Sequence, residues 1–127
     1  MLWYKVASNM KFSSNSDGTD KSWPLALQDW GLKITNAIYV LFVIDQSGAA
    51  AKVGAKHDEG PDTQVAYFIT HSTPIAVAAV ASTPKLVRGQ TSGGPLMPHF
   101  VPTVVVGSTG GLQWVVADVY VGGKPWT

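Results

Sequence analysis

Short runs of β-branched and aromatic residues, separated by turns rich in glycine, proline and small polar residues, succeed one another along most of this chain. The strongest run covers residues 32–45, whose first half alternates in polarity and whose second half is apolar on both faces. Residues 50–57 alternate again, with Lys52 and Lys56 on one face and small apolar residues on the other. No segment carries apolar residues at the spacing of a convincing amphipathic helix, so the sequence predicts a mostly β protein.

This segmentation predicts about eight short strands with turns between them. We expect the strands at residues 2–7, 32–45, 50–57, 64–71, 75–81, 85–88, 100–107 and 112–121. We expect loops or turns at residues 9–22, 46–48, 58–62, 90–98 and 108–111, and a loop with at most one helical turn at residues 23–31. Without crossover helices a parallel α/β fold is disfavoured, and the fold class predicted is all-β: an antiparallel, jelly-roll-like β-sandwich with little helix.

The chain of 127 residues predicts one domain, residues 1–127, because a second domain would be too small for a core of its own. Its core should be formed by alternate apolar residues of the best strands. The residues expected to be buried are Ile38, Val40, Phe42, Ile44, Val53, Val65, Tyr67, Ile69, Val104, Val106, Val115 and Val119.

The chain is unusually poor in charge, with 13% charged and 46% hydrophobic residues. Soluble domains carry roughly 25% charged residues, so a large part of this surface must lack charged groups. Surfaces of that kind are often covered by a partner, which favours a homo-oligomer or a larger protein assembly.

Charge and composition also exclude several partners. Nine basic residues face eight acidic ones, and Arg88 is the one arginine, so we expect no nucleic-acid partner. The longest apolar run, residues 37–44, is far shorter than the ~20 residues of a membrane-spanning helix, so we expect no membrane partner. The chain contains no cysteine, which excludes disulfides, thiolate zinc sites and cysteine nucleophiles.

No motif for catalysis, for a cofactor or for a metal is present. The densest polar cluster, residues 57–62, has enough oxygen ligands for a cation, but the same residues are typical of a solvated hairpin tip. His57, His71 and His99 have no zinc-site spacing, and no Gly-x-Ser-x-Gly elbow occurs. The sequence therefore predicts no catalytic, cofactor-binding or metal-ligating residues, no cofactor and no enzymatic activity.

Tryptophan is frequent, with five residues in this short chain. Several of them lie near the termini or in the irregular segment, where they could close the ends of a sandwich, contact a neighbouring subunit or stack on a sugar ring. The candidate interface residues are Trp3, Tyr4, Trp23, Trp30 and Trp126. Asp118 shares a strand face with Trp114 and Tyr120, so this face is either an outward, wet face of the sheet or a subunit contact.

Residues 51–62, followed by the aromatic residues 65–68, resemble hairpins of small phage-associated β-sandwich proteins, which read as an apolar strand, an Asp-Gly turn and an aromatic strand. Residues 98–106 and 115–126 resemble the final strands of the same proteins. The resemblance implies an accessory or decoration role in a virion and carries over no functional residue. The function expected is therefore a non-enzymatic structural protein that self-associates or decorates a larger assembly such as a phage capsid. The alternative is a lectin-like, carbohydrate-binding β-sandwich module with a glycan as its partner.

Overall fold

The computed structural model describes residues 2–25, 36–61, 69–70, 76–91, 96–97 and 99–124. These residues form antiparallel strands and connecting turns without a helix, as the all-β prediction requires. The strands are β1 Leu2–Ser13, β2 Lys21–Pro24, β3 Ile38–Gln46, β4 Ala51–Gly60, β5 Ile69–Thr70, β6 Ala76–Ala79, β7 Lys85–Gln90, β8 His99–Ser108 and β9 Trp114–Gly123.

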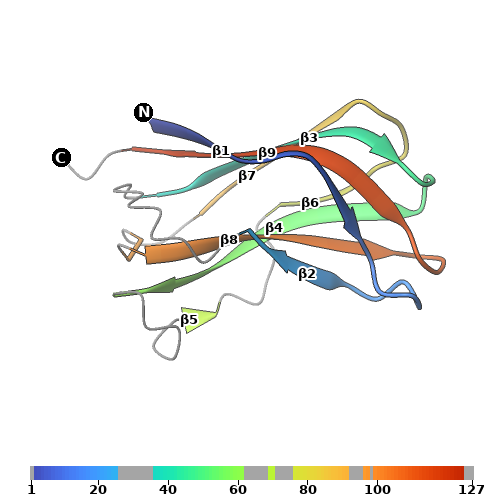
Figure 1. Cartoon of the computed structure of the whole chain (residues 1–127), viewed down its shortest axis with the longest axis horizontal. Helices are drawn as coiled ribbons and strands as arrows, with labels where there is room; N and C mark the ends of the chain where they lie inside the picture. Colours follow the sequence, from blue (N-terminus) through green and yellow to red (C-terminus); the bar gives the residue numbers. More distant parts are fainter. Residues whose placement is uncertain are drawn as a thin grey trace.

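The strands pair in a nested order that confirms the jelly-roll prediction. β1 pairs with β9, β2 with β8, β3 with β7, and β4 with both β5 and β6. This is the pairing of one long hairpin that has been rolled up into two sheets. The first sheet has the order β1-β9-β3-β7, and the second has the order β2-β8-β4-β5, with β6 also paired to β4. The two sheets form the upper and lower layers in Figure 1.

The core fills the space between the sheets. Alternation along each strand sends every second side chain inward, as the burial of β9 shows with Val115, Ala117, Val119 and Val121. The largest fully buried side chains are Tyr39, Phe12, Leu41, Val43, Val53, Val80, Val104, Val106 and Val115. Among the residues expected to be buried, the prediction is confirmed for Ile38, Val53, Val104, Val106, Val115 and Val119.

The predicted inward face of β3 was wrong. Tyr39, Leu41 and Val43 point into the core, whereas Phe42 and Ile44 are exposed and Val40 is only half-buried. A run that is apolar on both faces contains no alternation from which the inward set can be read, and a shift by one residue exchanges the two sets. Val65 and Tyr67 lie outside the described residues, as does the side chain of Ile69.

The loop predicted at residues 9–22 is shorter than expected. β1 continues to Ser13 and β2 begins at Lys21, so the polar connection contains only residues 14–20. Local hydrogen bonds hold this connection: Asp17 accepts hydrogen bonds from the backbone and the hydroxyl of Thr19, and Gly18 adopts a φ of 89°. A Cβ at Gly18 would lie 3.0 Å from the carbonyl oxygen of Ser108, so this close approach requires glycine.

The turn predicted at residues 58–62 was also wrong in its first half. Asp58, Glu59 and Gly60 belong to β4, where they pair with β8. Composition favoured a turn because aspartate and glycine are typical of turns, but the ladder with β8 overrides that preference. The predicted strand at residues 64–71 and the irregular segment at residues 23–31 lie largely outside the described residues; Trp23 and Pro24 belong to β2, and Ile69 and Thr70 form β5.

Candidate functional site

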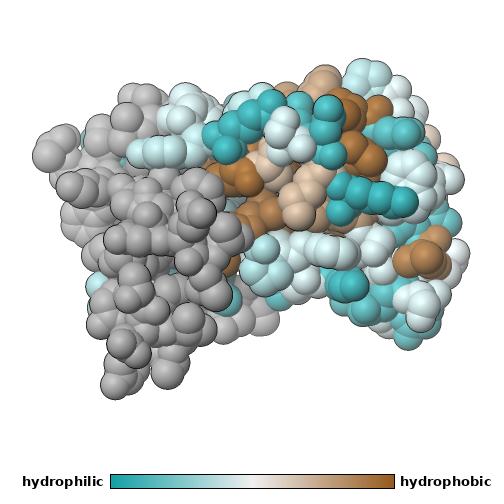
Figure 2. Space-filling model, viewed as in Figure 1, coloured by the Kyte–Doolittle hydropathy of each residue, from teal (hydrophilic) through white to brown (hydrophobic). Residues whose placement is uncertain are grey.

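The first sheet presents an outward surface that is rich in large apolar and aromatic residues. The register of β1, β9, β3 and β7 places side chains of alternate residues on this surface. We call the outer face the set Trp3, Lys5, Lys11, Val40, Phe42, Ile44, Leu86, Arg88, Trp114, Val116, Asp118 and Tyr120. Figure 2, which views the two sheets edge-on as Figure 1 does, shows brown side chains beside teal ones at the surface of the described part of the molecule.

Four large apolar residues of the outer face are strongly exposed to water. Leu86 is 60% exposed, Trp3 is 50% exposed, Phe42 is 38% exposed and Ile44 is 36% exposed. The indole of Trp3 lies directly over the backbone of Gly122, where an added Cβ would collide with its ring. One side of the Trp3 indole therefore packs on the sheet. Phe42, Ile44 and Leu86 lie on the neighbouring strands β3 and β7, whereas Trp3 stands on the opposite edge strand β1. Several large apolar residues exposed on one face are typical of a contact surface, whereas single ones are ordinary.

Asp118 lies on this outward face and is bound within its own chain. Its Oδ1 accepts a hydrogen bond of 2.8 Å from the backbone N–H of Asn9 and lies 3.7 Å from Nζ of Lys5. Asn9 has a φ of 49° and belongs to an irregular stretch of β1, where the register with β9 shifts. The irregular stretch of β1 turns the N–H of Asn9 away from the ladder, and the Asp118 carboxylate accepts its hydrogen bond. This contact explains why an aspartate occurs in the otherwise apolar strand β9.

Lysine side chains cover several aromatic rings. Nζ of Lys11 lies 4.6 Å from the ring centre of Trp114, and Nζ of Lys5 lies 5.5 Å from that of Tyr120. These are cation–π distances, and they leave less of each ring open for stacking on a flat ligand.

The predicted interface residues separate into different environments. Trp3 is on the outer face, whereas Tyr4 and Trp23 are partly buried against the core. The indole N–H of Trp23 donates to the carbonyl oxygen of Ser13 at 2.8 Å, and its ring meets that of Phe12 edge to face. Trp30 and Trp126 lie outside the described residues. The interface assignment of these residues stays a prediction.

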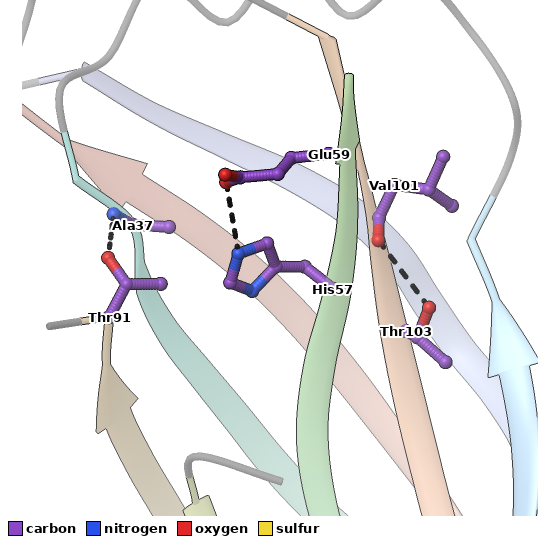
Figure 3. A network of polar contacts seen from close by, with 6 residues as sticks. All are labelled: Ala37, His57, Glu59, Thr91, Val101 and Thr103. Carbon is purple, nitrogen blue, oxygen red and sulfur yellow. Dashed lines mark hydrogen bonds and ion pairs between the residues drawn. The ribbon is translucent and has the colours of Figure 1, made fainter. Parts of the chain in front are cut away.

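A polar cluster lies between the sheets. His57 and Glu59 of β4 point inward, with His57 Nε2 3.4 Å from Oε2 of Glu59 (Figure 3). The ring of Tyr39 on β3 stacks on that of His57 with a centre-to-centre distance of 6.3 Å. Burial, and secondly the Glu59 carboxylate, raise the pKa of the Tyr39 hydroxyl above its ordinary value. This hydroxyl therefore remains protonated across the physiological range.

Neighbouring hydroxyl groups are engaged with the backbone. Thr91 accepts from the N–H of Ala37 at 2.9 Å, and Thr103 donates to the carbonyl oxygen of Val101 at 3.4 Å (Figure 3). Within the described ranges no group of three or more histidine, aspartate and glutamate side chains could hold a metal ion. The same ranges contain no helix of the length and hydrophobicity that crossing a membrane requires.

Sequence reasoning missed both regions in part. Phe42 and Ile44 were assigned to the core instead of the outer face, and the ambiguous phase of β3 is the reason. The signal for the interior cluster was present, since the inward alternation Ala51, Val53, Ala55 continues to residue 57 and residue 59.

No protein-family model matches this sequence, and no curated protein matches it. Solved structures share its fold at low sequence identity. The CBM22-1–GH10 modules of the Clostridium thermocellum endo-1,4-β-D-xylanase 10B, complexed with xylohexaose, match with a TM-score of 0.52 and 15% identity over 90% of this chain. The structure of the Gx strain of infectious bursal disease virus matches with a TM-score of 0.52 and 18% identity over 98% of this chain.

The VP2 subviral particle of infectious bursal disease virus matches with a TM-score of 0.50 and 15% identity over 94% of this chain. This chain spans 20% of the xylanase chain, 33% of the Gx-strain chain and 31% of the VP2 chain. At these identities the similarity shows the fold alone, a β-sandwich that occurs in carbohydrate-binding modules and in viral particles.

Proposed function

We propose that this chain is a non-enzymatic structural protein that self-associates or decorates a larger assembly, with a virion as its setting. The observation that carries the proposal is the concentration of Trp3, Phe42, Ile44 and Leu86 on one exposed sheet face. Covering such a face removes apolar surface from water at about 25 cal/mol per Å², which drives association. The low charge of the chain as a whole adds to this argument, because surface poor in charged groups is often covered by a partner.

The assembly proposed is a homo-oligomer or a capsid-type protein array. The fold similarity to viral particles supports this setting as an analogy of architecture. The proposal includes no nucleic-acid or membrane partner, since the basic residues of the outer face, Lys5, Lys11 and Arg88, are distributed around an apolar centre instead of forming one continuous basic face.

The alternative function is glycan binding by a carbohydrate-binding module. One observation favours it: Trp3 is half exposed, with its ring laid flat on the backbone of Gly122, which is a geometry suited to stacking on a sugar. The lysines above Trp114 and Tyr120 weaken it, because a row of open rings would make a longer platform. Self-association is therefore the first proposal.

Sedimentation velocity of the intact protein separates the two functions. The measurement covers about 1 to 100 μM, the range in which homo-oligomers of moderate affinity assemble. The structural proposal predicts a mass that rises with concentration and no response to sugar. A constant monomer mass, together with saturable quenching of tryptophan fluorescence by xylohexaose that Trp3→Ala abolishes, would establish the alternative. Xylohexaose is the probe because it was bound in the similar xylanase structure.

A further inference from the structure

We infer that two copies of this chain pack with the outer faces of their first sheets against each other. This inference rests on the proposed self-association and names the surface that produces it. It follows from the order of side chains across the sheet, from their charges and from the area that the face offers.

The pairing of the strands arranges the outer face in rows. One row runs Lys5, Tyr120, Val40 and Arg88 from β1 to β7, and the next runs Asp118, Phe42 and Leu86 from β9 to β7. Apolar side chains therefore occupy the middle of the face. The cations stand on β1 and β7, which are the two edge strands of this sheet. An apolar centre with a polar rim is the usual composition of a protein–protein interface.

The one carboxylate near the centre is already neutralised. Asp118 holds the N–H of Asn9 at 2.8 Å and faces Lys5 at 3.7 Å, so a second sheet can cover it without leaving an unpaired charge. Lys11 remains over the ring of Trp114, where its stem can stay at the rim. Three cations, Lys5, Lys11 and Arg88, and one carboxylate, Asp118, leave the face net positive; the cations stand on the edge strands, where their charged ends can stay in water while the apolar centre is covered.

The area is sufficient for a stable contact. Strands lie ~4.8 Å apart and rise ~3.4 Å per residue, so a four-stranded sheet with ten-residue β9 offers a face of roughly 19 by 34 Å. Two such faces bury about 1,300 Å² in total, above the ~1,000 Å² expected of a specific interface.

The shape of the face selects a second sheet as its occupant. An extended peptide adds to the edge of a sheet, where backbone groups are open, whereas this surface is a face whose backbone groups are paired within the sheet. A second copy supplies a matching twisted sheet that packs at ~10 Å, as the layers of a sandwich do. Because the same patch then contacts itself, the contact closes with twofold symmetry.

A pair of leucine variants tests the inference. Leu86→Glu places a charge on the outer face, and Leu112→Glu places the same charge at the 55% exposed leucine in the turn between β8 and β9, which is not one of the residues that define that face. Both leucines are exposed, so both variants should fold, which far-UV circular dichroism and thermal melting check. Sedimentation velocity over the same concentration range then measures the dissociation constant of each.

We expect Leu86→Glu to raise the dimer dissociation constant by on the order of 30-fold or more, because it replaces the most exposed apolar side chain of the face with a charge, and Leu112→Glu to leave it unchanged. If the unaltered protein associates and Leu86→Glu associates equally, the inference is overturned while the proposed function stands. A loss of association in Leu112→Glu alone would also overturn it and would assign the contact to the turn before β9. A protein that stays monomeric at every concentration would overturn this inference and the self-association, and would leave attachment to a larger assembly as the remaining form of the proposed function.

Discussion

Truncation of two adjacent residues of β3 should destabilise the protein to very different extents. Leu41 is fully buried between the sheets, whereas Phe42 points outward and is 38% exposed. Composition would assign the larger loss to the larger side chain, but the structure predicts that Leu41→Ala is the more damaging change. The comparison therefore tests which face of β3 is the core.

The magnitudes follow from burial. Leu41→Ala removes buried methyl groups and leaves a cavity that the surrounding valines cannot fill, so we expect a loss of about 3–4 kcal/mol in the free energy of unfolding. Phe42→Ala removes a side chain that is only partly covered, and water fills the space. At about 25 cal/mol per Å² this change should cost roughly 1–1.5 kcal/mol, without a cavity penalty.

Urea denaturation followed by tryptophan fluorescence measures both losses from the midpoint and the slope of each transition. The experiment is repeated at several protein concentrations, because association through Phe42 would add a concentration-dependent contribution to stability. Leu41→Ala and Phe42→Ala should have equal slopes and different midpoints. A loss for Phe42→Ala that equals or exceeds that of Leu41→Ala, at a concentration where the protein is monomeric, would refute the assigned face of β3.

Three further predictions concern single polar groups. Asp118→Ala should cost about 1 kcal/mol because the N–H of Asn9 loses its acceptor, whereas Asp118→Asn keeps an acceptor and should cost only a few tenths, as equilibrium unfolding will measure. Asn9→Gly should leave thermal stability unchanged or raise it slightly, and Asn9→Val should lower it by about 1–2 kcal/mol, because the backbone φ of 49° is strained for a branched residue. The raised pKa of Tyr39 means that the folded state holds this proton more tightly, so its contribution to stability is complete below the ordinary pKa of 10.0 and is lost as the pH rises beyond it. Urea titrations above pH 10 should show an extra slope of up to ~1.4 kcal/mol per pH unit that Tyr39→Phe removes, and equal slopes in both proteins would contradict the burial of the hydroxyl.

The class of fold could be predicted because its signals are local. Alternation at residues 50–57 identified the inward set Ala51, Val53 and Ala55, and the glycine-containing segment 108–111 marked the turn before β9. The nested pairing of β1 with β9 and of β2 with β8 joins residues far apart in the chain, and no local pattern encodes which strands meet.

Local sequence patterns predicted the wrong inward face or the wrong strand end at positions where pairing with neighbouring strands determines the structure. The run from Ile38 to Ile44 is apolar at every position, so only the packing against β9 and β7 shows that Phe42 faces outward. Residues 9–13 belonged to the loop predicted at residues 9–22, yet they extend β1 because the neighbouring β9 supplies a ladder for residues 10–13. An outward face built from residues that composition assigns to a core is recognisable only once the register is known.

Sedimentation velocity of the unaltered protein tests the central claim most directly, since every step of the functional account depends on an exposed sheet face that associates. From a monomer mass of 13.5 kDa at low concentration, the weight-average mass should rise toward twice that value within the micromolar range typical of moderate homodimers. A mass of 13.5 kDa that does not change with concentration would contradict the claim.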